Sequence, residues 1–303
     1  MAGSLLHPIA LRHVLAVIGA AWLAAPAAGE VPQVVTDFGP TQSLVAQVMG
    51  DLGAPVMLLG AGADPHDFQM KPSQAQALAG ADLVFWVGPE LTPALEHAIA
   101  ALGENARAVA LLHLGRGTTR AVEGGAIDPH AWLDPANAEA WLATIAAELT
   151  QQDPEHAATY GANAAAAQTA LQALDAELAA RLAPVRDRPF VVFHDALGYF
   201  ADHYGLQVVG AIELGDAAAP GAAQLAQIRR VLAEGGALCV FPEAGRDPKF
   251  VATVTAGSGA RIGASQDIEA ITLPPGPGLY AALLRGLAGT LTDCLSAAPD
   301  NRP

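Results

Sequence analysis

The sequence has little basic charge and little sulfur, and both shortages exclude classes of function. Among 303 residues, 15 Lys and Arg stand against 30 Asp and Glu, which gives a formal net charge of −15. A chain this acidic is repelled by phosphate backbones, so we expect no nucleic-acid partner. Two cysteines are too few for a thiolate-rich zinc module, whereas nine histidines are enough for an imidazole site. Hydrophobic residues make up 52%, so the chain can bury a large core.

Common catalytic and phosphate-binding signatures are also missing. The sequence contains no GxxxxGK[ST] phosphate loop, no GxSxG nucleophile elbow and no HExxH metalloprotease motif. We therefore predict no catalytic residues, and that the protein is not an enzyme.

The first thirty residues have the pattern of an export signal. A mildly basic start precedes an apolar run over 14–23, and residues 25–29 supply the small side chains of a cleavage site. The run is too short to span a bilayer comfortably, and no cysteine near the cut could carry a lipid anchor. We predict that residues 1–29 are a cleaved signal peptide. The mature chain is then expected in an exported compartment, a bacterial periplasm.

Short apolar runs alternate with helical stretches on both sides of one long Ala-rich segment. Such alternation predicts an α/β fold with parallel sheets. The segment from Asp153 to about Leu182 has no glycine or proline after Gly161 and carries leucines at helical spacing. We therefore predict two lobes, each a mostly parallel sheet flanked by helices, joined by one long rigid helix. The predicted divisions are 30–152 for the N-terminal lobe, 153–184 for the linking helix and 185–303 for the C-terminal lobe.

Three histidines occupy similar places relative to the predicted elements. His66 follows the second strand, His130 precedes a helix, and His194 ends the first strand of the second lobe. Because ligands bind outside the carboxyl ends of strands in open α/β sheets, these imidazoles can meet between the lobes as metal ligands. For each histidine alone, a turn residue bonded to the backbone is the ordinary alternative. Asp267, after the last predicted strand, is the candidate fourth ligand, and a water molecule is its alternative.

The two cysteines lie far apart in the sequence. Cys239 falls inside a predicted strand, and Cys294 lies near the end of the last predicted helix. In an exported protein two such cysteines can pair. Two buried free thiols are the alternative.

Three stretches of the chain carry a resemblance to a known family, and two further stretches support it. The three are 62–68 (GADPHDF), 128–135 (DPHAWLDP) and 192–195 (VFHD), and the supporting two are 260–263 and 275–280. Together they resemble the zinc- and manganese-specific solute-binding proteins of bacterial ABC importers, most closely the periplasmic zinc-uptake branch. The resemblance covers nearly all of the mature chain. It implies two α/β lobes bridged by a long helix, with His66, His130 and His194 as metal ligands and a disulfide between Cys239 and Cys294.

The same resemblance implies a function. The protein would capture Zn²⁺ in the cleft between the lobes and deliver it to the membrane permease of an ABC importer, and we expect it to act as a monomer. Manganese-binding relatives tend to carry a carboxylate where this chain has His194, and three neutral imidazoles suit Zn²⁺ better than Mn²⁺. The alternatives are a manganese-binding protein, a mononuclear zinc hydrolase with three histidine ligands, and a surface adhesin.

The chain departs from the family pattern in three places. Between Leu114 and Asp128 it has no histidine-rich loop, so we expect no metal acquisition by such a loop. Around Asp267 it has one extra residue and lacks the usual proline, which leaves the fourth ligand open. Residues 241–245 (FPEAG) differ from the family's usual Glu-Pro sequence, which concerns the shape of the cleft and not the histidine ligands.

Overall fold

The structure is a computed structural model of the chain. It describes residues 30–60, 62–63, 65–114, 117–122, 125–215 and 220–297, together with Met1 and Gly3. The predicted signal peptide therefore lies outside the described residues, except for those two positions. Among the helices in the described part, none has both the length and the apolar character needed to span a bilayer.

Two four-stranded parallel sheets form the framework of the molecule. Their strand orders are β2-β1-β3-β4 and β6-β5-β7-β8, and every paired strand runs parallel to its neighbour. The first sheet comprises β1 (Val34–Thr36), β2 (Val56–Met57), β3 (Leu83–Trp86) and β4 (Arg107–Ala110). The second comprises β5 (Phe190–His194), β6 (Val208–Glu213), β7 (Cys239–Val240) and β8 (Arg261–Ile262). The predicted fold class, with two parallel-sheet α/β lobes, is confirmed.

Helices connect and flank the strands of both sheets. Those around the first sheet are α1 (Gly39–Met49), α2 (Pro72–Ala79), α3 (Pro93–Leu102) and α4 (Pro135–Gln152). Those around the second are α6 (Gly198–Tyr204), α7 (Ala222–Ala233), α8 (Lys249–Thr255) and α9 (Leu279–Leu295). Short 3-10 turns are η1 (Gly50–Leu52), η2 (Pro65–Asp67), η3 (Leu111–His113), η4 (Ala131–Leu133), η5 (Pro154–His156) and η6 (Ala183–Val185).

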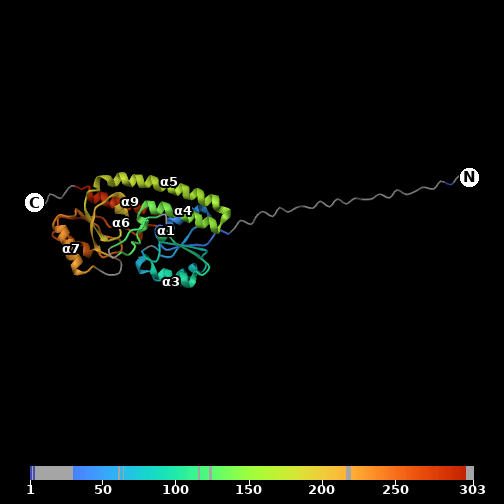
Figure 1. Cartoon of the computed structure of the whole chain (residues 1–303), viewed down its shortest axis with the longest axis horizontal. Helices are drawn as coiled ribbons and strands as arrows, with labels where there is room; N and C mark the ends of the chain where they lie inside the picture. Colours follow the sequence, from blue (N-terminus) through green and yellow to red (C-terminus); the bar gives the residue numbers. More distant parts are fainter. Residues whose placement is uncertain are drawn as a thin grey trace.

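The predicted linking helix is present as α5, Ala157–Leu182, which runs along both lobes at the top of Figure 1. Its 26 residues give a rod of about 39 Å at 1.5 Å per residue. Alanine has the highest helix propensity, so the composition favours this length. The helix buries one stripe, which includes Leu171, Leu174, Leu178 and Leu182, against the rest of the molecule.

The last helix, α9, returns to the first half of the chain, which the sequence did not indicate. It packs against α1 as well as α5. The hydroxyl of Ser43 in α1 donates to the carbonyl of Pro277 at 3.0 Å and accepts from the amide of Tyr280 at 3.1 Å. One hydrophobic core therefore continues through both lobes, and a smaller cluster packs α7 and α8 against the second sheet.

Cys239 and Cys294 form a disulfide, as the sequence and the family resemblance predicted. It joins β7 to the end of α9, 55 positions apart in the sequence. The same end of α9 accepts a hydrogen bond from Arg261 in β8 to the carbonyl of Cys294, at 2.6 Å. The helix that reaches the first lobe is thus fastened to the second sheet.

Candidate metal centre

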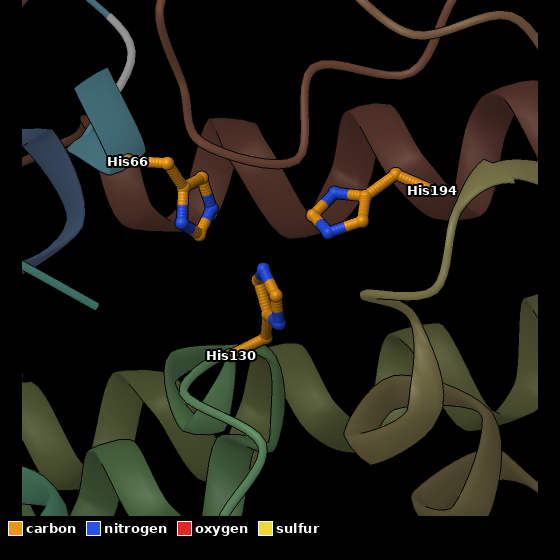
Figure 2. Close-up of side chains that lie close together, drawn as sticks. All are labelled: His66, His130 and His194. Atoms are coloured by element: carbon orange, nitrogen blue, oxygen red, sulfur yellow. The ribbon is translucent and has the colours of Figure 1, made fainter. Parts of the chain in front are cut away.

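Three imidazoles from three separate segments point toward one another (Figure 2). Their ring centroids are 5.6 Å apart for His66 and His130, 5.7 Å for His66 and His194, and 4.8 Å for His130 and His194. One nitrogen from each ring lies within 4.8 Å of the other two. The group could hold one shared metal ion once the rings draw in to about 2 Å from it.

Each histidine owes its place to the local fold. His66 belongs to the 3-10 turn η2 after β2, His130 directly precedes the 3-10 turn η4, and His194 is the last residue of β5. Parallel pairing brings the carboxyl ends of neighbouring strands to one edge of each sheet, and the two edges face each other here. The side chains are 7%, 2% and 2% exposed, in the same order. The cluster is therefore closed to bulk water.

The orientation of His130 is set by Asp128. One oxygen of Asp128 accepts from the His130 amide at 3.0 Å and lies 2.7 Å from the ring Nδ1. Burial acts to raise the pKa of Asp128, but hydrogen bonds from His130 and Arg120 together hold that pKa below its usual range. An ionised Asp128 accepts a hydrogen bond from Nδ1–H, which leaves Nε2 as the nitrogen with a free lone pair. Nε2 is buried without a hydrogen-bond partner among the described residues, as a metal-ligating nitrogen would be.

Two buried glutamates adjoin the histidines. Glu269 Oε1 lies 3.1 Å from His66 Nε2, and Glu243 Oε1 lies 3.6 Å from His194 Nδ1. His194, Glu243 and Glu269 form a second group whose ligand atoms lie within 4.8 Å of one another. Glu243 Oε2 and Glu269 Oε1 accept no hydrogen bond from the described residues. Buried carboxylate oxygens without donors are costly alone, and a cation beside them would offset that cost.

Asp267, the predicted fourth ligand, does not belong to either group. Its carboxylate accepts from the amides of Ile271 at 2.8 Å and Thr272 at 2.9 Å, which ties it to the following turn. The acid brought to the histidines is Glu269, two residues later. Sequence reasoning missed both Glu269 and Glu243. Both could have been found by the rule used for the histidines, because each follows a strand of the second sheet.

Comparisons with known proteins agree with one another. The family model described as "ZnuA: Zinc-uptake complex component A periplasmic" matches residues 34–294. The "High-affinity zinc uptake system protein ZnuA" of Paracoccus denitrificans is 48% identical over 309 residues, covering 90% of this chain and 95% of the relative. The protein of the same name from Brucella suis is 37% identical, covering 89% and 93%. A crystal structure of ZnuA superposes with a TM-score of 0.76 at 27% identity, covering 87% and 99%.

Proposed function

The chain belongs to the ZnuA family of periplasmic zinc-uptake components, and on that premise we propose that it captures Zn²⁺ with His66, His130 and His194. The observation that carries the proposal is the convergence of three buried imidazole nitrogens within 4.8 Å of one another. Neutral imidazoles are preferred ligands of Zn²⁺, which has no geometric demand beyond about four donors. The ion is cargo: it is bound, protected from competing ligands and passed on.

We propose Glu269 as the carboxylate that completes the site, in place of Asp267. Three features support Glu269: its 3.1 Å approach to His66, its burial, and an oxygen that accepts no hydrogen bond from the described residues. The carboxylate of Asp267, in contrast, is already used by backbone amides of the next turn. Since carboxylate oxygens suit Mn²⁺ as well as Zn²⁺, metal preference has to be measured with both ions.

Delivery follows capture. The loaded protein docks on the permease of an ABC importer, which removes the ion for transport into the cell. Residues 1–29 are removed on export, and the mature chain, with lobes 30–152 and 185–303 joined by 153–184, works in the periplasm as a monomer without a lipid anchor. Enzymatic activity is not part of the proposal, because histidines 7%, 2% and 2% exposed give an organic substrate no access to the ion.

The test is a competition titration of the mature protein with a chromophoric zinc chelator. Single His66→Ala, His130→Ala and His194→Ala changes should each weaken zinc binding more than about 100-fold, since loss of an outer partner alone typically costs 10–100-fold. Glu269→Gln should weaken binding, and Asp267→Asn, the matched control, should leave affinity unchanged. Undiminished affinity in His130→Ala would refute the site. A larger loss in Asp267→Asn than in Glu269→Gln would restore the original assignment.

A further inference from the structure

The buried histidines make release of the ion depend on an opening of the protein. With all three imidazoles at or below 7% exposure, an ion cannot leave while the surrounding segments keep their positions. On the helix side of the molecule the lobes share a continuous hydrophobic core through α1, α5 and α9. Opening therefore has to occur on the opposite side, where polar groups join the segments that carry His130 and His194.

One arginine makes several of those polar contacts. The amide of Arg120, in the loop that leads to His130, donates to the hydroxyl of Tyr199 at 2.8 Å. Its guanidinium donates to Asp202 at 3.2 Å through Nε and to Asp128 at 3.1 Å through Nη1. Tyr199 and Asp202 belong to α6, whereas Asp128 belongs to the same loop as Arg120. The side chain thus bridges from the first lobe to the second.

The guanidinium of Arg120 packs directly against α6 at Gly198, where any residue with a Cβ would leave no room for it. A Cβ on Gly198, the first residue of α6, would lie 2.3 Å from the guanidinium carbon of Arg120. No pair of non-bonded carbon atoms tolerates that distance, so any larger residue at this position would displace the guanidinium. The hydroxyl of Tyr199 adds a further hydrogen bond between α6 and this loop, because it donates to the carbonyl of Asp128 at 3.0 Å.

Both ends of this bridge connect directly to proposed ligands. One carboxylate oxygen of Asp128 accepts a hydrogen bond from the Arg120 guanidinium, and the other is hydrogen-bonded to the His130 ring. Helix α6 begins four residues after His194. Separating Arg120 from α6 would therefore loosen the junction between the His130 segment and the His194 segment, leaving the Tyr199–Asp128 hydrogen bond as a remaining contact.

We propose that Arg120 is a latch between the lobes, a positioning residue that sets how fast the metal ion leaves. The inference rests on the proposed capture of Zn²⁺. Arg120 does not touch the ion. It stabilises the closed arrangement in which His130 and His194 face the same point, so loss of the latch raises the frequency of opening. Only the bond to the exposed Asp202 carboxylate joins this side chain to the second lobe, and exposed ion pairs are weak, so an increase in release rate of about two- to fivefold is expected.

The first experiment measures zinc release from the loaded mature protein by stopped-flow mixing with excess chelator. Arg120→Gln removes the positive charge. Gly198→Ala keeps the charge but moves the guanidinium of Arg120 away from α6. Both should release zinc about two- to fivefold faster. Arg120→Lys should lie between them and wild type, because one ammonium cannot contact two carboxylates as a planar fork does. Arg285→Gln is the matched control: it breaks an exposed pair with Glu177 at 2.7 Å between α5 and α9, and should leave the release rate unchanged.

Two further measurements separate the latch from a general loss of structure and from failure of the proposed function. The visible absorption of bound Co²⁺ should stay as in wild type in every latch variant, because the ligand set is intact. Hydrogen–deuterium exchange of the metal-free protein should be faster in α6 and around residues 117–122 and 125–130 in Arg120→Gln, and not in Arg285→Gln. Unchanged exchange there overturns the latch even if the protein binds no zinc. Faster exchange with an unchanged release rate overturns its role in release.

Discussion

The two lobes meet on two sides that differ in chemistry. On the helix side, α1, α5 and α9 join through buried apolar side chains such as Leu171, Leu174 and Leu287. On the opposite side the junction is made by polar groups, and most of them are buried. The residues concerned are Asp128, His130, His194, Glu243 and Glu269, each less than 9% exposed, with the half-exposed Arg120 beside them.

The difference assigns separate tasks to the two sides. Apolar packing has no preferred direction, and its free energy is lost only when whole faces separate. Polar contacts depend on direction and partner, so one group can exchange a hydrogen bond for a metal ion while its neighbours stay in place. Changes on the helix side should therefore lower stability with little effect on zinc, and changes on the polar side should affect zinc more than stability. Variants on each side can test that separation.

Loss of the disulfide should have the largest effect on stability. Replacing both Cys239 and Cys294 by serine opens a loop of 55 residues, which the chain-entropy model values at about 4 kcal/mol. Zinc affinity should not change, because Cys239 pairs in register with Phe190, at the far end of β5 from His194. Urea unfolding and zinc titration of the same variant provide the measurement. A zinc affinity that falls together with stability would contradict the separation.

Truncation of Leu178 in α5 should likewise lower stability without affecting zinc. This side chain is fully buried, so Leu178→Ala should lower the free energy of unfolding by about 3 kcal/mol through lost burial and the cavity left behind. Leu102→Ala, at a position 39% exposed, is the control and should cost less than about 1 kcal/mol. The zinc release rate of the folded variant should equal that of wild type. Faster release from Leu178→Ala would show that the helix side also governs opening.

On the polar side, loss of the Tyr199 hydroxyl should speed zinc release as well as lower stability. Tyr199→Phe removes a hydroxyl that accepts from Arg120 and donates to Asp128, at a cost of about 1–2 kcal/mol. Tyr204→Phe is a matched control, because its hydroxyl donates to Asp175 in α5 at 2.8 Å, away from the histidines. The two variants should lose similar stability, but only Tyr199→Phe should release zinc faster. Equal release rates in the pair would contradict the assignment of Tyr199 to the polar junction.

The helix side was largely predictable from sequence, because its signals are local. The leucine stripe of α5 has helical spacing and lies in an Ala-rich segment without interior proline, so a long buried helix follows from propensity and periodicity. The return of α9 to α1 was not predictable. It depends on long-range hydrogen bonds, such as those of Ser43, and no local pattern encodes those.

The polar side was predictable only in part. The three histidines follow from the placement of ligands at strand ends, and the structure brings them together. Asp267 was predicted as the carboxylate ligand, whereas Glu269, two residues later, lies 3.1 Å from His66, and a loop has no periodicity from which to infer which side chain faces inward. The role of Arg120 was invisible for a similar reason: its partners Tyr199 and Asp202 are about 80 positions away in the sequence.

His203 lies where the two sides meet, and the stability effect predicted for it is the smallest. Its Nδ1 lies 2.9 Å from Asp134 at the start of α4, and its Nε2 lies 2.9 Å from Asp175 of α5. The hydrogen bond with Asp134 raises the pKa of His203, burial opposes this, and Asp175 raises it further. Because the folded pKa lies above the unfolded value of about 6.5, the stabilisation is complete below that pH and is lost as pH rises through the folded pKa.

The unfolding free energy of wild type relative to His203→Gln should therefore fall by up to about 1 kcal/mol between about pH 6 and about pH 9. Denaturant titrations at both values measure it, and a difference that does not change with pH would show that the imidazolium gains nothing from the two carboxylates. The zinc release rate of His203→Gln shows whether the contacts of His203 belong to the helix side or to the polar side. His203 lies on α6, as does Gly198, which Arg120 contacts. Its two partners, however, lie at the start of α4 and on α5. A release rate unchanged by His203→Gln therefore places it with the stabilising helix side, and faster release would place it with the latch.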